Sequence, residues 1–347
     1  MVRRGEYDED DVRVRPSRSS RPRTRQRPRH ADAVEAMVTA VHLGRYLCVR
    51  DGTTVTAMRA RELGRRAVVV GDRVALVGDV SGDPDTLARI VRVAPRRSVL
   101  RRTADDDAAT PEGRLERIVV ANADQLVIVS ALADPPPRTG FIDRCLVAAY
   151  DAGIDPLLCL TKADLLEQPG HRAESELAMI RDYYASLALP HLLCRPDRSL
   201  DELRQALQGR MSVLVGHSGV GKSTLVNRLV PGADRAVGAV SAVGKGRHTS
   251  SSAVALRLPA HGREDPGWII DTPGVRSFGL AHVSADSLLE SFSDLVEASA
   301  DCPPGCDHAS DRGCALDAQV AAGRADPRRL ASYRRLLASR GSDRFSP

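Results

Sequence analysis

Residues 216–224 read GHSGVGKST, and this stretch decides the fold of the chain. It matches the pattern G-x-x-x-x-G-K-[ST], in which glycines let backbone N–H groups turn inward around phosphate oxygens. An apolar run, SVLV (212–215), precedes it, and a helical pattern, KSTLVNRL (222–229), follows. A helix that begins at such a loop points its N-terminal dipole at a bound anion. The sequence therefore predicts a strand, a phosphate loop and a helix that together bind a nucleotide.

The side chains of this phosphate loop have distinct predicted roles. Lys222 is expected to reach the β- and γ-phosphates and so to be catalytic, and the Ser223 hydroxyl is expected to ligate magnesium. The other residues predicted to line the nucleotide are Gly216, His217, Ser218, Gly219, Val220, Gly221 and Thr224. The loop by itself does not distinguish ATP from GTP.

A second magnesium motif, WIIDTPG (268–274), comes later in the chain. Asp271 ends an apolar run and is predicted to hold magnesium through water. Gly274 is predicted to present its N–H to the γ-phosphate, in a loop that relaxes once that phosphate leaves. Between the two motifs lies the Gly- and Ser-rich stretch SAVGKGRHTSSS (241–252), where Thr249 is a third predicted magnesium ligand. The alternative for this stretch is a flexible linker hairpin.

The residue after DTPG is Val275, at a position where many GTPases have a glutamine that orients water. Valine cannot orient water, so the isolated protein is expected to turn over slowly. His248 is the predicted replacement, because a neutral imidazole can accept a hydrogen bond from the attacking water. The alternative is that a partner supplies the missing group.

The four residues TKAD (161–164) form the predicted base loop, after the apolar run PLLCL (156–160). Asp164 is expected to accept hydrogen bonds from guanine N1–H and N2–H, a pair that adenine lacks. Lys162 is expected to pack its stem over the base. Thr161 stands where asparagine is usual, and we expect it to tie the loops together more weakly. The alternative of an ATPase or kinase predicts that ATP competes with GTP.

Four metal-ligating residues crowd together near the C-terminus: Cys302, Cys306, His308 and Cys314. Three thiolates and one imidazole suit a closed structural zinc site. The alternatives are a disulfide, which a reducing compartment disfavours, or unligated thiols. The remaining cysteines lie in apolar runs and are predicted to be small core residues: Cys48, Cys145, Cys159 and Cys194.

The pattern of apolar runs divides the chain into regions. Residues 34–97 hold Val-, Thr- and Ile-rich runs about every ten residues, which predict a small β-barrel. An OB-type barrel is the first interpretation and an SH3-like barrel the alternative. From residue 116, strands alternate with helical patterns, which predicts a parallel α/β sheet, with Ser199 as the N-cap of one helix. The predicted boundaries are a basic arm at 1–33, the barrel at 34–100, a linker at 101–115, the GTPase domain at 116–281 and a helical zinc-binding domain at 282–347.

Positive charge is concentrated in one arm. Residues 13–30 hold eight arginines and no acid, and removing these eight charges from the net charge of +5 leaves −3. This Arg/Pro/Ser-rich arm cannot bury enough apolar surface to fold, so we expect it to be disordered and to act as a tether to a phosphate backbone. A solvated tail without a partner is the alternative. No apolar run approaches the ~20 residues that span a bilayer, so we expect a cytoplasmic protein without membrane contact.

The base loop precedes the phosphate loop, which is a circular permutation of the ordinary GTPase order. A sheet domain tolerates such a change where its termini lie close together. With GHSGVGKST, GRHTS (246–250), DTPGVRSF (271–278), the barrel before them and the cysteine cluster after them, residues 34–340 resemble the ribosome small-subunit-dependent GTPase A family. The chain departs from that family's pattern by serines at 250–252 and by a shorter spacing between Cys302 and Cys306.

The resemblance implies a GTP hydrolase that acts as a late assembly and maturation factor of the small (30S) ribosomal subunit. Such proteins bind the subunit and its rRNA in the GTP form, are stimulated by it, and leave after hydrolysis to GDP. It implies one structural zinc, magnesium bound with GTP, and a monomer. The alternative function is a GTP-gated RNA-binding scaffold in which hydrolysis is incidental.

Overall fold

The computed structural model describes residues 30–64, 67–102, 117–233, 253–260, 265–272, 278–280, 282–309 and 313–342. Most of the predicted basic arm lies outside the described residues, as do His248, Thr249 and Gly274. None of the helices in the described ranges is long and apolar enough to cross a membrane.

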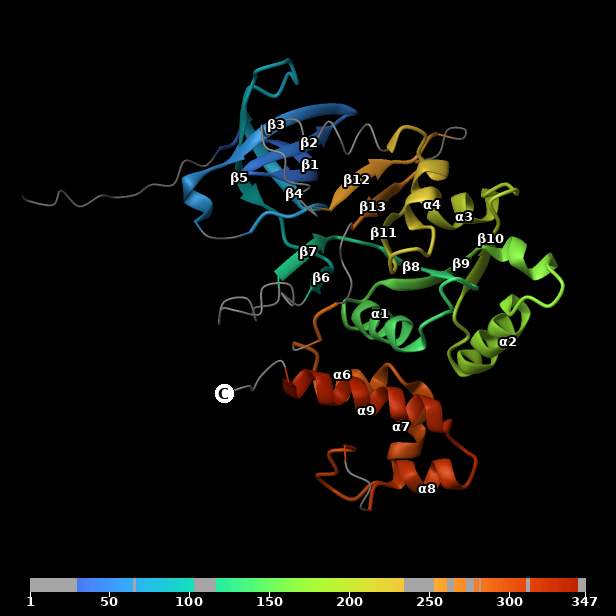
Figure 1. Cartoon of the computed structure of the whole chain (residues 1–347). Coiled ribbons are helices and arrows are strands. Elements are labelled where there is room, and N and C mark those ends of the chain that lie inside the picture. Colours follow the sequence, from blue (N-terminus) through green and yellow to red (C-terminus); the bar gives the residue numbers. More distant parts are fainter. Residues whose placement is uncertain are drawn as a thin grey trace, which may run out of the picture. The chain divides into compact units, whose positions relative to one another are not determined.

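The central sheet carries the pattern that the sequence predicted from residue 116 (Figure 1). Its parallel strands are β8 (Gln125–Ala131), β9 (Asp155–Thr161), β10 (His191–Cys194), β11 (Met211–Val215) and β13 (Trp268–Asp271), in the order β10-β9-β8-β11-β13. All seven residues of β8 are buried, as expected for a parallel strand covered on both faces.

The central sheet is not entirely parallel, although the sequence predicted it to be. Strand β12 (Val254–Arg257) pairs antiparallel with β13. Only ten residues, 258–267, join these two strands, whereas a parallel connection needs a crossover of a dozen or more. The short connection therefore fixes the antiparallel direction.

Helices cover both faces of the central sheet. Their bounds are α1 (Thr139–Asp151), α2 (Ala173–Tyr183), α3 (Asp201–Leu207) and α4 (Lys222–Leu229), with short 3-10 turns η5 (Ala163–Glu167) and η6 (Ala185–Leu187). Residues of α1 and α2 pack with Leu126 and Ile128 of β8, whereas α3 and α4 pack with Val127 and Val129 on its other face. The predicted N-cap Ser199 is wrong: Leu200 precedes α3 and no side chain caps it.

The N-terminal strands form the predicted barrel (Figure 1). They are β1 (Val34–His42), β2 (Arg45–Arg50), β3 (Thr53–Arg59), β4 (Arg73–Gly78) and β5 (Ala88–Val93), followed by a separate ribbon of β6 (Val99–Arg102) and β7 (Arg117–Ala121). A 3-10 turn, η2 (Arg61–Leu63), follows β3. Pairing closes in the order β1-β2-β3-β5-β4-β1 with β3 and β5 parallel, which is the strand order of an OB fold. The OB-type prediction is therefore confirmed over the SH3-like alternative.

How the barrel and the central sheet meet was not predicted from the sequence. Ala40 of β1 pairs antiparallel with Val254 of β12, so barrel and central strands form one continuous sheet among the described residues. The β6–β7 ribbon was also not predicted. Ala40 and Val254 lie 214 residues apart, and such a pairing leaves no local signal in the sequence because it is made by backbone groups of distant strands.

The C-terminal region is helical, as predicted, with α6 (Ala285–Glu290), α7 (Ser293–Ser299), α8 (Ala315–Ala321) and α9 (Pro327–Ser342). Ser284 caps α6, because its hydroxyl accepts the N–H of Ser287. Buried residues of these helices, among them Leu288 and Tyr333, belong to the same hydrophobic cluster as Ile142 of α1.

Candidate nucleotide site and metal cluster

The predicted nucleotide-binding loops meet at one edge of the central sheet. Thr161 ends β9, Val215 ends β11 and Asp271 ends β13, and these strands run parallel. Strand β8 lies between β9 and β11, with Ala131 opposite Thr161 and Ile128 opposite Val215. Ligands of open α/β sheets bind at the carboxyl ends of the strands. The fold thus brings together three motifs that are spread over residues 161–271 of the sequence.

The phosphate loop requires glycine at named positions. A Cβ on Gly216 would lie 2.6 Å from the Val129 carbonyl oxygen, so this position is closed to any other residue. Gly219 and Gly221 have φ of 82° and 87°, in the left-handed region that glycine adopts without strain. Helix α4 begins at Lys222, directly after the loop, as the motif predicts.

Thr161 joins the base loop to the phosphate loop. Its side chain is buried, with 6% of the residue exposed, and its hydroxyl donates to the Val220 carbonyl oxygen. The same hydroxyl lies 3.4 Å from the carbonyl oxygen of Ser130. The connection that asparagine usually makes is therefore present here through a threonine hydroxyl.

The rest of the base loop is shaped to receive a ligand. Lys162 has a left-handed backbone, with φ of 55°, and its ammonium donates to the carbonyl oxygen of Asp134. Asp164 lies in the first turn of η5, and its Oδ1 is buried without a hydrogen-bond partner among the described residues. A buried carboxylate oxygen without a donor is costly. The N–H groups of a guanine base would satisfy it.

Lys222 and Asp271 face each other at the phosphate end of the site. Their side chains form an ion pair and are only 12% and 16% exposed. Thr272 is held by a 2.8 Å hydrogen bond from its hydroxyl to the carbonyl oxygen of Leu214. Ser223 is exposed at the start of α4, where a ligand can reach it. These residues can hold a phosphate chain and a hydrated divalent cation.

Sequence reasoning missed the contact between the phosphate loop and α1. The rings of His217 and Phe141 lie 4.1 Å apart, beside a hollow of about 220 Å³ that Arg138 also lines. Burial lowers the pKa of His217, and the positive charge of Arg138 lowers it further, which favours the neutral imidazole. A phenylalanine on a helix carries no motif that could have revealed this contact.

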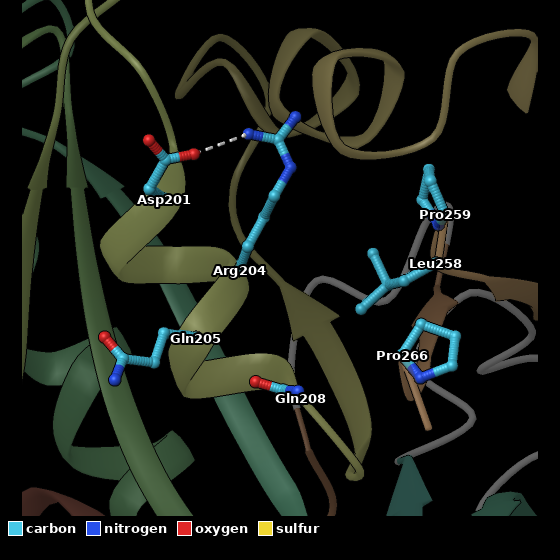
Figure 2. Close-up of a pocket in the computed structure, with 7 residues that line it drawn as sticks. All are labelled: Asp201, Arg204, Gln205, Gln208, Leu258, Pro259 and Pro266. Atoms are coloured by element: carbon cyan, nitrogen blue, oxygen red, sulfur yellow. Dashed lines mark ion pairs between the residues drawn. The ribbon is translucent and has the colours of Figure 1, made fainter. Parts of the chain in front are cut away.

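A larger hollow, of about 260 Å³, lies elsewhere (Figure 2). Asp201 and Arg204 of α3 form one wall, and Leu258 and Pro266 lie opposite. None of the predicted site residues lines it.

The four predicted metal ligands come together. One ligand atom from each of Cys302, Cys306, His308 and Cys314 lies within 4.8 Å of the others. A tight turn accommodates the short spacing between Cys302 and Cys306. In this turn the Cys306 N–H donates to the Pro303 carbonyl oxygen at 3.1 Å, and Gly305 has φ of 78°. This donor set can hold a metal ion.

Helix α9 supports this cluster from the side. The Arg334 guanidinium donates to the His308 carbonyl oxygen at 3.0 Å and forms an ion pair with Asp317 at 2.7 Å. The other cysteines, Cys48, Cys145, Cys159 and Cys194, are buried as predicted.

Comparison with known proteins agrees with this geometry. A sequence model of the RsgA GTPase family matches residues 93–281. A small ribosomal subunit biogenesis GTPase RsgA of Pseudomonas aeruginosa is 42% identical over 278 residues, which cover 79% of this chain and 76% of that protein. The chain belongs to the RsgA GTPase family. The RsgA of Chlorobaculum parvum is 35% identical over 288 residues, covering 82% of this chain and 89% of that one.

Two solved structures share the fold of this RsgA-family chain. The crystal structure of YloQ, a circularly permuted GTPase, superposes with a TM-score of 0.64 at 22% identity and covers 92% of this chain and 98% of that one. YjeQ from Thermotoga maritima has the same TM-score and identity, with coverage of 88% and 98%. The base loop precedes the phosphate loop here, so the chain is a circularly permuted GTPase.

Proposed function

We propose that this GTPase binds GTP between the base loop and the phosphate loop and discriminates guanine through Asp164. The observation that carries this proposal is the buried Oδ1 of Asp164, which has no hydrogen-bond partner in the described part of the chain and lies at the edge of the sheet where the phosphate loop begins. Lys162 packs over the base, and Thr161 keeps the two loops together. The residues of 216–224 surround the phosphates, with Lys222 on the β- and γ-phosphates.

Magnesium is the proposed metal of this nucleotide site. Ser223 and Asp271 would hold it, directly and through water, together with Thr249 from the segment between the motifs. When bound, the ion would neutralise negative charge on the oxygens of the transferred phosphoryl group. Since Lys222 already contacts Asp271, binding of the nucleotide is expected to exchange this ion pair for contacts to phosphate and metal.

For catalysis, we propose that His248 positions the attacking water and that Gly274 senses the γ-phosphate. Val275 cannot play the role of a water-orienting glutamine. A His248→Ala variant is expected to lose stimulated turnover while keeping its affinity for GDP. If stimulated turnover persists in that variant, a partner supplies the group instead.

At the C-terminus, zinc is the proposed occupant of the Cys3His cluster. Three thiolates and one imidazole suit structural zinc, which is bound by four protein ligands in a closed tetrahedral site. We assign the boundaries of the regions as 1–33 for the arm, 34–100 for the barrel, 101–115 for the linker, 116–281 for the GTPase domain and 282–347 for the zinc-binding domain.

The cellular role we propose is late maturation of the small (30S) ribosomal subunit in the cytoplasm, by a monomer that binds rRNA in the GTP form and leaves after hydrolysis. Support comes from the names of relatives that match most of this chain at 35–42% identity. The basic arm, with eight arginines in residues 13–30, suits contact with an RNA backbone.

One experiment tests this role directly. GTP turnover and co-sedimentation are measured with isolated 30S subunits, with 50S subunits as the control, in the presence of GDP or a non-hydrolysable GTP analogue. Many-fold stimulation by 30S alone, with binding only in the GTP form, is the expected result. Flat, slow turnover with GTP-dependent binding would instead indicate a GTP-gated scaffold.

A further inference from the structure

Arginine side chains connect α3, the helix of the phosphate loop and the turn that follows the base loop. Arg204 of α3, drawn in Figure 2, donates to the carbonyl oxygen of Arg228 in α4 at 3.1 Å. Arg228 donates from Nη1 to the carbonyl oxygen of Arg195 at 2.7 Å, and from Nη2 to that of Arg198. One guanidinium on the phosphate-loop helix thus holds two backbone carbonyls of the stretch 195–198.

The other side of this stretch is tied to the base loop. Both terminal nitrogens of Arg195 pair with the two carboxylate oxygens of Glu167, the last residue of η5. The Nε of Arg195 also donates to Asp197 at 3.1 Å. The stretch 195–198 is therefore fixed from both sides.

The sheet places this stretch directly beside the residues that read the base. Cys194 ends β10 and pairs with Thr161, which ends β9. Residues 195–198 therefore leave the sheet next to residues 162–164, at the same edge. Arginine suits the task because its planar fork pairs bidentately with a carboxylate and presents several fixed donors, whereas lysine offers a compact point charge.

Ordering a loop residue costs conformational entropy. A loop that is already held in place before the ligand arrives saves that cost on binding. The Arg195–Glu167 ion pair contributes less to holding the stretch 195–198 in place, because the Glu167 side chain is 64% exposed and exposed ion pairs are weak. The two Arg228 contacts, a part-buried one to the carbonyl oxygen of Arg195 and an exposed one to that of Arg198, hold the backbone of the stretch directly and are therefore the main restraint.

We propose that Arg228, with Arg195, is a positioning residue for guanine: it holds the stretch 195–198 against the base loop and so keeps Asp164 aligned with the base. This inference rests on the proposed binding of guanine nucleotides. It assigns a role in base discrimination to an arginine of the phosphate-loop helix whose guanidinium donates to backbone carbonyls.

The test compares affinities of the full-length protein for GDP and for inosine diphosphate, which lacks the exocyclic amino group that Asp164 is proposed to bind. In the Arg228→Ala variant we expect affinity for GDP to fall about tenfold. Affinity for inosine diphosphate should fall less, so the ratio between the two shrinks. The kcat at saturating GTP should stay near that of the wild type, and the loss of affinity should appear as a higher KM for GTP.

Two further variants keep the test sharp. Arg195→Ala removes the exposed side of the same restraint and should shift the ratio in the same direction but less. Arg210→Ala is the matched control. Arg210 directly precedes β11 and pairs at 2.9 Å with Asp155, the first residue of β9, so this pair lies at the end of the strands away from the nucleotide site. The substitution should leave the ratio of the two affinities unchanged.

The outcomes separate this inference from the proposed function. A wild-type protein that does not prefer GDP over inosine diphosphate would overturn the proposed function. A wild-type preference that survives in Arg228→Ala, or equal losses of affinity for both nucleotides, would overturn the positioning role alone.

Discussion

Thr161 shows how a single residue can keep a function with different chemistry. The sequence predicted a weaker link between the loops at this position, because threonine replaces the usual asparagine. In the structure its hydroxyl is buried and donates to the carbonyl oxygen of Val220. Burial strengthens such a hydrogen bond, because water does not compete for it.

Replacing Thr161 by valine keeps the shape of the side chain and removes this donor. A hydrogen bond of this kind contributes about 1 kcal/mol, so we expect the dissociation constant for GDP to rise about fivefold. Titration with a fluorescent GDP analogue measures it. Thr86→Val, which removes a hydroxyl contact in a barrel turn, is the control. An unchanged constant in Thr161→Val would show that the loops are held by other contacts.

Asp164→Asn tests the base loop itself. An asparagine amide can donate to the C2 oxygen of xanthine but meets a donor at the guanine amino group. We expect affinity for GDP to fall at least a hundredfold, since buried polar groups are left unpaired, and affinity for xanthosine diphosphate to rise. Competition binding with the two nucleotides and ADP gives the answer. Equal affinity of the wild type for ADP and GDP would support the ATPase alternative.

At the scale of elements, the phosphate loop depends on its close contact with strand β8. A Cβ on Gly216 would overlap the Val129 carbonyl, which belongs to a fully buried strand and cannot retreat. We therefore expect Gly216→Ala to abolish measurable GDP binding and to lower the melting temperature.

Gly140 provides the matched comparison for this substitution. It lies inside α1, and its nearest neighbour to an added Cβ is a side-chain nitrogen of Arg335 at 3.9 Å. Alanine there should stabilise the protein by up to about 1 kcal/mol and leave GDP binding intact. Calorimetry and nucleotide titration on both variants distinguish contact geometry from a general effect of adding a methyl group.

At the scale of the whole molecule, the zinc proposed for the Cys3His cluster is expected to organise the C-terminal helices. We expect purified protein to contain about one zinc per chain, and a strong chelator to remove it with loss of protection in α7 and α8. Elemental analysis and hydrogen exchange measure the two effects. Cys306→Ser should lose the metal, whereas Cys145→Ala, at a buried position outside the cluster, should keep it. Intact C-terminal helices in the metal-free protein would contradict a structural role.

Docking of the C-terminal helices depends on a buried carboxylate. Asp143 of α1 is 2% exposed and accepts hydrogen bonds from the hydroxyls of Tyr183, Tyr184 and Ser332, the last from α9. Burial raises the pKa of Asp143, while these hydroxyls and the charge of Arg329 act in the opposite direction. This cluster joins the GTPase helices to α9.

Asp143→Ala removes the carboxylate that accepts from three hydroxyl groups, of which Tyr184 retains the carbonyl oxygen of Thr139 at 3.3 Å. We expect a loss of about 3 kcal/mol in stability, seen as a lower melting temperature and as faster hydrogen exchange in α9. Asp182→Ala is the control, because its 2.7 Å pair with Arg328 joins α2 to α9 at an exposed position and should cost under about 1 kcal/mol. Equal effects of the two substitutions would argue against a special role for the buried cluster.

The sequence by itself determined the motifs, their order and the elements that carry them. Glycine spacing at 216–221, apolar runs before Thr161 and Asp271, and the Cys3His set are local patterns, since each arises from the geometry of one strand, turn or helix. The order of TKAD before GHSGVGKST was enough to predict a permuted GTPase. The spacing of the runs predicted a small barrel, whereas the strand pairing distinguished the OB type from the SH3-like alternative.

Only the tertiary structure decided which distant groups meet. It alone showed that Thr161 reaches Val220, that Arg228 holds residues 195–198, and that β1 joins β12. The chain has 50 lysines and arginines, and all but three of them are arginine. No sequence pattern therefore distinguishes Arg228 from the other arginines. Such contacts depend on side chains brought together by chain topology, and their partners lie too far apart in sequence to leave a periodic signal.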